Sequence, residues 1–287
     1  MRALAALLLL AACAQPPAPA PQPRFLLGEG YRMGGQWSYP REDFALDERG
    51  VAAILPAGRG GLTANGERRD DRAMAAAHRT LQLPAIVSVT NLENGRTLRL
   101  RVNERGPEQP GRVLAVSPRA AELLGARGPF QARVVVDGPA SRRAAAGLPG
   151  QGPAIAVAAA PVAAVGRESL APPAGARAAA PRAETPRRAA ADAAPEAAPE
   201  PEALPESVQP GPASPGRLFL EAGTFFRADL ARAQAARLGL GAEPAGPPGR
   251  QQPWRVRGGP YASLAEADAA FARALQSGQQ ELRLVVE

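Results

Sequence analysis

The sequence predicts two small domains, one mostly β and one α+β, joined by a long linker. Short alternating segments separated by turns, with one small helix among them, indicate a compact β-barrel for the first domain. A β-α-β-α-β order near the end of the chain indicates helices packed on a small sheet. Between them, residues 140–215 are rich in Ala, Pro, Gly, Arg and Glu. Such a segment cannot bury enough apolar surface to offset its chain entropy, which predicts a disordered Ala/Pro-rich linker.

A β-hairpin gives the strongest local signal in the first domain. Residues 86–92 and 97–103 alternate in polarity and flank Glu93-Asn-Gly-Arg96. An Asn-Gly pair between two alternating runs favours a tight hairpin turn. Residues 112–116 and 130–136 predict two more strands.

A short helix is predicted between these last two strands, over residues 118–124. Ser117 is suited to cap its start, Pro118 to occupy the first helical position, and Gly125 to end it. In the second domain the same criteria predict strands over 218–225, 254–261 and 281–286, with helices over 227–238 and 263–275.

The N-terminus has the pattern of an exported lipoprotein. One early positive charge and a short apolar run precede Leu10-Ala-Ala-Cys13, and the run is too short to span a bilayer. Cys13 is the only cysteine, so no internal disulfide is available to it. We expect a signal peptide over 1–12, lipid attachment at Cys13, and a tether over 13–30; an ordinary signal peptide is the alternative.

The composition is basic, with a net charge of +7 and a pI near 10.9. Aromatic residues make up only 4% and no zinc or RNA-binding motif is present. Because export also separates the chain from nucleic acid, no nucleic-acid partner is expected. Neither a metal nor an organic cofactor is indicated.

The polar residues that could form a site gather around His78, the only histidine. Glu67 and Asp70 lie upstream of it in an Asn-Gly turn, and Arg101-Val-Asn-Glu-Arg-Gly-Pro107 follows the predicted hairpin. Side chains carried on turns often converge in one groove. From composition alone, the alternative is a solvated loop with an incidental histidine.

The order of these motifs resembles the rare lipoprotein A (RlpA) family. The matching pieces are T-A-N-G-E-x-x-D, A-A-H-x-T-L, V-x-V-T-N-L-x-N-G-R and R-V-N-E-R-G-P, over roughly residues 50–137. The family consists of double-psi β-barrel enzymes of the bacterial envelope. The resemblance therefore implies a six-stranded double-psi β-barrel, which we assign to residues 31–139.

The second domain, residues 216–287, resembles the sporulation-related repeat (SPOR) family. The matching pieces are A-G-x-F near its start and W-R-V-R-x-G-P-Y before its second helix. The resemblance implies a small α+β, ferredoxin-like fold that binds peptidoglycan glycan strands lacking stem peptides.

The first resemblance also implies an activity, endolytic peptidoglycan lytic transglycosylase, which leaves 1,6-anhydromuramyl ends. It implies that Asp70 is the acid, His78 its partner and Glu67 a supporting group; Asp71 is a rival for the acid. Substrate-binding residues expected on the same basis are Asn65, Asn103, Glu104 and Arg105. A cell-envelope location on the periplasmic side is expected, at the outer rather than the inner membrane because Ala14, not Asp, follows Cys13.

The chain departs from the family at four places. Ala52-Ala-Ile-Leu-Pro56 replaces an aromatic Ala-Ser-Trp-Tyr-Gly segment, and Arg59-Gly-Gly61 replaces a His-Gly step. Glu104 and Ala115 stand where the family has Asp. Two alternatives follow: a catalytically impaired, expansin-like peptidoglycan binder, and a structural protein that acts with division-site partners through its C-terminal domain.

Overall fold

The computed structural model describes residues 19–58, 60–151, 203–247, 249, 252–279 and 281–287. The expected signal peptide and Cys13 lie outside these residues, as does most of the expected linker. Within the described part, none of the helices combines the length and the apolar character needed to cross a bilayer.

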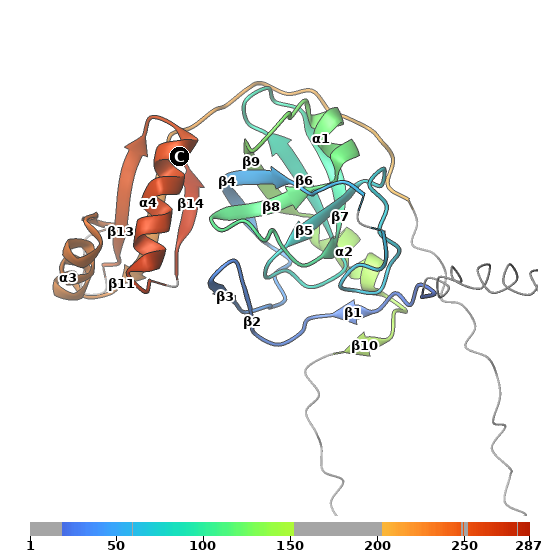
Figure 1. The fold of residues 1–287 in the computed structure, drawn as a ribbon, viewed down its shortest axis with the longest axis horizontal. Helices are drawn as coiled ribbons and strands as arrows, with labels where there is room; N and C mark the ends of the chain where they lie inside the picture. The colour runs from blue at the N-terminus through green and yellow to red at the C-terminus, as the bar shows by residue number, and fades with distance from the viewer. Residues whose placement is uncertain (1–18, 59, 152–202, 248, 250–251, 280) are drawn as a thin grey trace, which may run out of the picture. The chain divides into compact units, whose positions relative to one another are not determined.

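The first domain is a closed six-stranded barrel (Figure 1). Its strands are ordered β4-β8-β5-β7-β6-β9, and a β4–β9 pairing closes the ring. The β4–β8 and β5–β7 pairs are parallel and the others antiparallel. The strands are β4 (Asp47–Ile54), β5 (Ala75–His78), β6 (Ala85–Asn91), β7 (Thr97–Glu104), β8 (Arg112–Val116) and β9 (Phe130–Val136).

The barrel interior explains the alternation seen in the sequence. In β9 every second residue is buried, and the inward side chains of the ring form one apolar cluster. Each fully buried Val or Leu stabilises the fold by about 1.5–3 kcal/mol. Fully buried examples are Val87, Val89, Leu98, Leu100 and Leu114.

The predicted hairpin and helix are both confirmed. Strands β6 and β7 flank a turn in which Gly95 has a φ of 78°. Helix α1 (Pro118–Leu124) begins at Ser117, whose hydroxyl accepts a hydrogen bond from the Ala120 N–H at 3.2 Å. It ends at Gly125 in the left-handed conformation.

Two barrel strands carry weak sequence signals and were not predicted. Strand β5 is Ala-Ala-Ala-His, and β4 begins with the charged residues Asp47-Glu-Arg49. Alanine has little β propensity, so the neighbours of β5, rather than its own composition, determine its conformation. Ala76 and Ala77 are fully buried between β7 and β8.

The first domain extends beyond both expected limits, 31 and 139. The Gln22 N–H donates to the Gly66 carbonyl at 2.9 Å, and Leu26 exchanges backbone hydrogen bonds with Leu83. After the barrel, helix α2 (Gly138–Ala145) is capped by Asp137. Strand β10 (Gly150–Gln151) then pairs in parallel with β1 (Phe25–Leu26).

The described end of the expected linker, residues 203–216, also contacts the barrel. Gln209 and Thr97 exchange backbone hydrogen bonds, and the Gln131 side chain bonds the backbone of Gly216. Leu204 and Val208 pack against the barrel core. The expectation of disorder from 140 to 215 is therefore too broad at both ends, because these contacts supply the burial that composition alone does not reveal.

The second domain is a sheet with two helices, as expected, but the sheet has four antiparallel strands rather than the three predicted. Leu220, Val256 and Leu284 point from the sheet to a core shared with the helices. One strand, β12, was not predicted; it is a short, mostly exposed edge strand that ends at a proline. The elements are β11 (Leu218–Phe225), α3 (Ala228–Leu238), β12 (Gly241–Pro244), β13 (Trp254–Tyr261), α4 (Leu264–Gln276) and β14 (Arg283–Val286).

A small hairpin precedes the barrel strands, formed by β2 (Tyr31–Met33) and β3 (Gln36–Ser38). Arg79 fixes it to the barrel. Its backbone carbonyl accepts from the Tyr31 hydroxyl at 2.9 Å, and its guanidinium donates to the Met33 carbonyl at 3.1 Å.

Candidate active site

The loop from Thr63 to Asp71 carries the predicted acids. Its first part is a tight turn, in which the Gly66 N–H donates to the Thr63 carbonyl and the Thr63 N–H to the Glu67 carbonyl. Gly66 has a φ of 83°, and a Cβ there would collide with the Gln22 carbonyl. A glycine is therefore required at this point, and the turn directs Glu67 into the protein.

Glu67 is a buried anion whose oxygens are fully engaged. Its carboxylate accepts hydrogen bonds from Asn65 Nδ2 at 2.8 Å and Asn103 Nδ2 at 2.9 Å. Arg101 adds a two-pronged contact, with Nε at 2.9 Å and Nη2 at 2.6 Å from Oε1. The Glu67 side chain is only 3% exposed. It therefore holds the loop to β7 and has no free oxygen for substrate.

The charged form of Glu67 is stabilised. Burial raises the pKa of this carboxyl, but the hydrogen bond and positive charge of Arg101, with the amides of Asn103 and Asn65, outweigh it. The pKa of Glu67 therefore lies below its ordinary value. A group that remains ionised is a poor proton donor, which favours a supporting role for Glu67.

Asp70, three residues further on, is exposed at the surface. One of its oxygens, Oδ1, accepts a hydrogen bond from the Arg72 N–H at 2.8 Å. The other oxygen, Oδ2, has no hydrogen-bond partner among the residues that the structure describes. The neighbouring Asp71 is less exposed; its Oδ2 accepts from the Gly58 N–H at 2.6 Å, and its Oδ1 also has no partner among the described residues. Asp70 is thus the more exposed of two adjacent carboxylates that each keep one oxygen available to a ligand.

Asp70 borders a groove made of two hollows. The larger has a volume of about 440 Å³, and the smaller, which Asp70 lines, about 20 Å³. The two share three lining residues, so they adjoin: Leu55, Arg69 and Glu104. Glu104 Oε1 accepts hydrogen bonds from the N–H groups of Ala64 and Arg105. The groove therefore brings Asp70 and Glu104 together.

His78 has a different hydrogen-bond partner from the one expected. Its Nε2 lies 3.1 Å from Glu48 Oε1 on β4, and its Nδ1 accepts from the N–H groups of Thr80 and Leu81. An Nδ1 that accepts leaves the proton on Nε2, which donates to Glu48. His78 also lies three residues along β5 from Ala75, the β5 residue that lines the hollow of Asp70, or roughly 10 Å. The pairing of His78 with Asp70 implied by the resemblance is therefore replaced by a pairing with Glu48.

The residues expected to bind substrate divide into two groups. Asn65 is fully buried and Asn103 is 7% exposed, and both amides donate to Glu67. The Arg105 guanidinium donates to the carbonyls of Leu81 and Leu27, so it fixes backbone. Burial lowers the pKa of Arg105. Glu104 and Arg105 line the larger hollow, and Asn103 and Glu104 line the smaller one, whereas Asn65 lines neither.

Three alanines lie beneath the groove, and one of them, Ala115, stands where the family has an aspartate. Ala53, Ala77 and Ala115 come from β4, β5 and β8 and form one small buried cluster. Ala53 and Ala115 line the larger hollow. Since Ala115 is 1% exposed, the side chain here leaves the groove with an apolar floor and no negative charge from this position.

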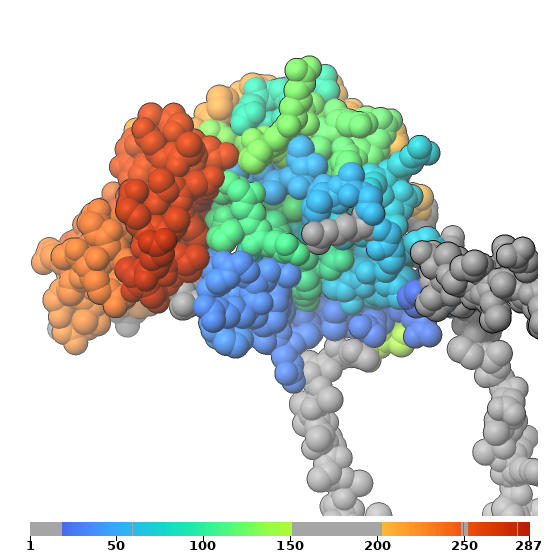
Figure 2. Space-filling view, in the orientation of Figure 1, coloured from blue at the N-terminus to red at the C-terminus, as the bar shows by residue number. Residues whose placement is uncertain are grey.

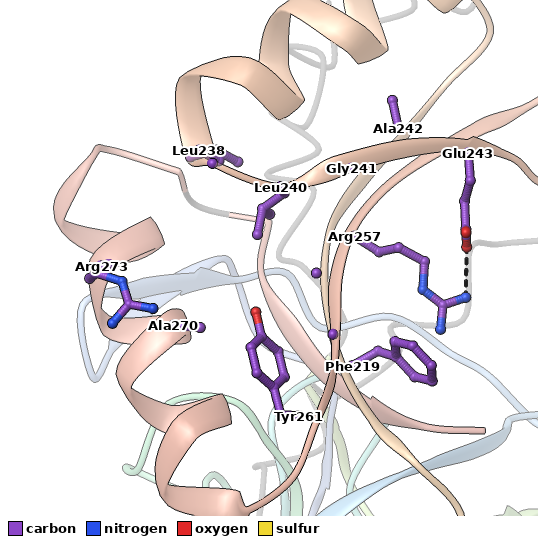
Figure 3. A pocket seen from close by; sticks show the side chains of 13 residues that line it. Phe219, Leu238, Leu240, Gly241, Ala242, Glu243, Arg257, Tyr261, Ala270 and Arg273 are labelled. Atoms are coloured by element: carbon purple, nitrogen blue, oxygen red, sulfur yellow. Dashed lines mark hydrogen bonds and ion pairs between the residues drawn. The ribbon is translucent and has the colours of Figure 1, made fainter.

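The second domain has its own hollow of about 670 Å³ (Figure 3). The Arg257 guanidinium lies 3.7 Å from the centre of the Phe219 ring and pairs with Glu243 at 2.7 Å. Tyr261 and Arg273 contribute a hydroxyl and a second cation to the lining. Burial raises the pKa of the Tyr261 hydroxyl, so it remains a neutral donor. This combination of an aromatic ring, cations and a hydroxyl suits a polar ligand that carries negative charge.

The structure shows two residues that the sequence analysis missed, Glu48 and Arg101. Glu48 is separated from His78 by 30 positions, and no motif links the two. Arg101 is in the matched R-V-N-E-R-G-P piece, but its partner Glu67 is 34 positions away. Within the described ranges there is no group of three or more His, Cys, Asp or Glu side chains that could hold a metal ion.

Comparison with known families supports both expected domains. Residues 47–136 match the double-psi β-barrel family described as lytic transglycolase, and residues 214–282 match the SPOR domain family. Residues 47–136 therefore form a domain of the lytic-transglycolase type, and the chain is similar to RlpA-family proteins. The matches confirm the double-psi barrel and the SPOR domain, and they imply a peptidoglycan-associated location in the cell envelope.

Several relatives are named endolytic peptidoglycan transglycosylase RlpA. The protein of Pseudomonas aeruginosa PAO1 is 42% identical over 123 residues, covering 42% of this chain and 36% of the relative. That of Rickettsia bellii is 35% identical over 117 residues, covering 39% and 52%. That of Yersinia pestis is 36% identical over 144 residues, covering 42% and 40%. The aligned part of the chain thus spans about half or less of each relative's length.

Proposed function

We propose that this protein is an endolytic lytic transglycosylase that cleaves peptidoglycan glycan strands lacking stem peptides. The observation that carries the proposal is the position of Asp70. It is an exposed carboxylate that lines the smaller hollow of the groove, with one oxygen uncommitted among the described residues, and the buried Glu67 fixes its loop. The relatives named as transglycosylases support the reaction class.

The reaction requires one acid and no second protein nucleophile. Asp70 in its acid form donates its proton to the glycosidic oxygen as the bond to C1 of the muramic acid breaks. The C6 hydroxyl of the same sugar then bonds to C1 and returns its proton to the Asp70 carboxylate. The products are a free sugar hydroxyl and a 1,6-anhydromuramyl end, and no water is consumed.

The remaining groups position the acid. Glu67 and Arg101 hold the loop against β7, and Glu104 tethers it through the Ala64 N–H. His78, paired with Glu48, fixes β5 to β4 and acts at a distance from the sugar. Loss of position by about 1 Å lowers rates on the order of 100-fold, so these groups affect activity without touching the substrate.

Digestion of amidase-treated glycan, with mass spectrometry of the ends, tests the proposal. The native protein should produce anhydromuramyl ends, and Asp70→Asn should lower their rate of formation by about 10²–10⁴-fold. Asp71→Asn is the matched control, because Asp71 lines the same hollow but is less exposed, and an amide oxygen there can still accept from the Gly58 N–H. This variant should retain most activity. Equal rates for the native protein and Asp70→Asn would remove Asp70 from its role.

A second function is favoured by Ala115 and the apolar floor of the groove. In this alternative the protein holds or loosens glycan without cleaving it. Native protein that binds denuded glycan but yields no anhydro ends at any pH from about 4 to 8 would select it, since this range spans ordinary carboxyl and histidine titration.

The SPOR domain, in this proposal, supplies the preference for strands without stem peptides. Residues 214–287 should bind sacculi more strongly after an amidase has removed the peptides. Binding that is equal before and after amidase treatment would count against this preference.

We also propose that lipid on Cys13 anchors the protein on the periplasmic side, at the outer rather than the inner membrane, where division-site proteins are candidate partners. Cys13→Ser should release the protein into the soluble periplasmic fraction. A variant that stays with the membrane, together with a native protein that takes up no labelled fatty acid, would contradict the anchor.

A further inference from the structure

Two exposed aromatic rings lie on the β2–β3 hairpin, outside the groove described above. Trp37 is 49% exposed and Tyr39 is 66% exposed. Their ring centres are 6.3 Å apart and the ring planes differ by 16°. Large aromatic side chains are seldom left in water as a pair, and such patches often mark an interaction site.

The hairpin register determines the direction in which these rings point. Gln36 and Ser38 are buried, whereas Trp37 between them is exposed, so the two faces of β3 differ. Arg32 pairs directly with Trp37 across the hairpin, which places their side chains on the same outer face. The segment that contains this hairpin, drawn in blue, forms part of the surface visible in Figure 2.

The rings are held in place by the backbone. A Cβ at Gly30 would lie 2.8 Å from the Tyr39 ring, so the ring packs directly on the glycine. Arg79 ties the hairpin to the barrel through Met33 and Tyr31. A ring held in this way, as Tyr39 is, loses little side-chain entropy when a ligand stacks on it.

The same hairpin also lines the groove. Met33, on the face opposite Trp37, lines the larger hollow together with Glu104 and Arg105. The hairpin therefore borders the groove with one face and carries the two rings on the other, so a strand reaches the rings by leaving the groove over the edge of the hairpin. Arg32 has no ion-pair partner among the described residues, and its charge is available to an anionic group of such a strand.

We propose that Arg32, Trp37 and Tyr39 form an aromatic platform that binds one or two sugar rings of the glycan beside the groove. The apolar faces of the pyranose rings stack on the aromatic rings, and Arg32 faces a lactyl carboxylate, which is free only when the stem peptide is absent. The platform replaces the aromatic segment that Ala52–Pro56 lacks. The inference rests on the proposed function, because it takes the same glycan as ligand.

Tryptophan fluorescence tests the platform in the full-length chain. The chain has two tryptophans, so Trp254→Phe leaves Trp37 as the only one. Adding a denuded glycan tetrasaccharide should change Trp37 emission saturably and protect it from acrylamide. Tyr39→Ala or Arg32→Gln should weaken this response by between about twofold and tenfold. Chitotetraose, which has no lactyl carboxylate, should bind more weakly than the glycan.

Phe226→Ala is the matched control, because Phe226 is an aromatic of the SPOR domain that is 71% exposed. It should leave the Trp37 response unchanged. If a saturating concentration of glycan does not change Trp37 emission, the platform is wrong. It is also wrong if the emission changes only with protein concentration, because a second copy of the chain would then cover the rings. A Trp37 response without anhydro ends supports the platform and removes only the catalytic proposal. If anhydromuramyl ends form but Trp37 fluorescence does not change, only the proposed platform is wrong.

Discussion

The two ends of the loop from Thr63 to Asp71 differ in almost every physical respect. At the inner end, Glu67 is buried and bonded to two amides and a guanidinium. At the outer end, three residues later, Asp70 is exposed and has an oxygen free of protein partners in the described structure. The charge of Glu67 fixes the loop, whereas the charge of Asp70 is available to a ligand. Both carboxylates belong to one motif, but the structure separates their roles.

Removing each carboxylate in turn tests whether Glu67 and Asp70 differ in their contribution to stability. Glu67→Ala leaves Arg101 partly buried without its partner and should lower the free energy of unfolding by about 3–5 kcal/mol. Asp70→Ala should change it by no more than about 0.5 kcal/mol. Urea denaturation at pH 7 measures both. Similar losses for the two variants would mean that the ends of the loop do not differ in this way.

Lowering the pH should remove the stabilising contribution of Glu67. Because the pKa of Glu67 is lower in the folded protein, its contribution to stability is fully present above the unfolded value of about 4.3. It is lost as the pH falls through the lower folded pKa. We expect the free energy of unfolding of the native protein to fall more steeply below about pH 4 than that of Glu67→Gln. Parallel curves for the two proteins would refute the lowered pKa.

Introducing a carboxylate at Ala115, on the floor of the groove, should destabilise the protein, whereas the exposed carboxylate of Asp70 does not. Ala115→Asp puts a charge among Ala53, Ala77 and Leu55, with no partner in this cluster, and should destabilise the protein by about 1–3 kcal/mol. Ala115→Ser, which is smaller and uncharged, should cost less. Thermal unfolding of the two variants checks this order, and an unchanged Ala115→Asp would show that the floor is open to water.

The smallest effect is expected at Glu104, which binds the loop at the Ala64 N–H. Glu104→Asp shortens the side chain by one methylene and should lose the hydrogen bond from the Ala64 N–H, at a cost of about 0.5–1.5 kcal/mol. If the aspartate that is usual in the family suits the groove, the rate of anhydro-end formation should stay the same or rise. A rate that falls with no loss of stability would indicate that this chain has adapted to the longer residue.

Local sequence signals predicted most of the fold where side-chain pattern and turn chemistry agree. The hairpin at Asn94-Gly95, the helix capped by Ser117 and the strand over 130–136 all follow from such signals. Strand β5 does not, because four residues with three alanines become a strand only between two neighbours. Hairpin β2–β3 was missed because each strand has three residues, too few to show a period.

The sequence indicated which residues belong to the candidate site but not which of them contact one another. The motif spacing identified Asp70, Glu67 and Glu104 as a group, and these residues do lie in or behind one groove. The burial of Asn65 and the pairing of His78 with Glu48 depend on how strands far apart in sequence cross in the barrel. Spacing within one segment carries no information on such contacts.

The bond between Gln22 and Gly66 fixes the N-terminal segment to the barrel. If Cys13 carries lipid as proposed, only residues 14–22 separate the anchor from the first residue held by the barrel. Nine residues, fully extended, reach about 30 Å. The groove would then reach only the layer of peptidoglycan next to the membrane. Glycan strands further away would be cleaved only after they enter that layer.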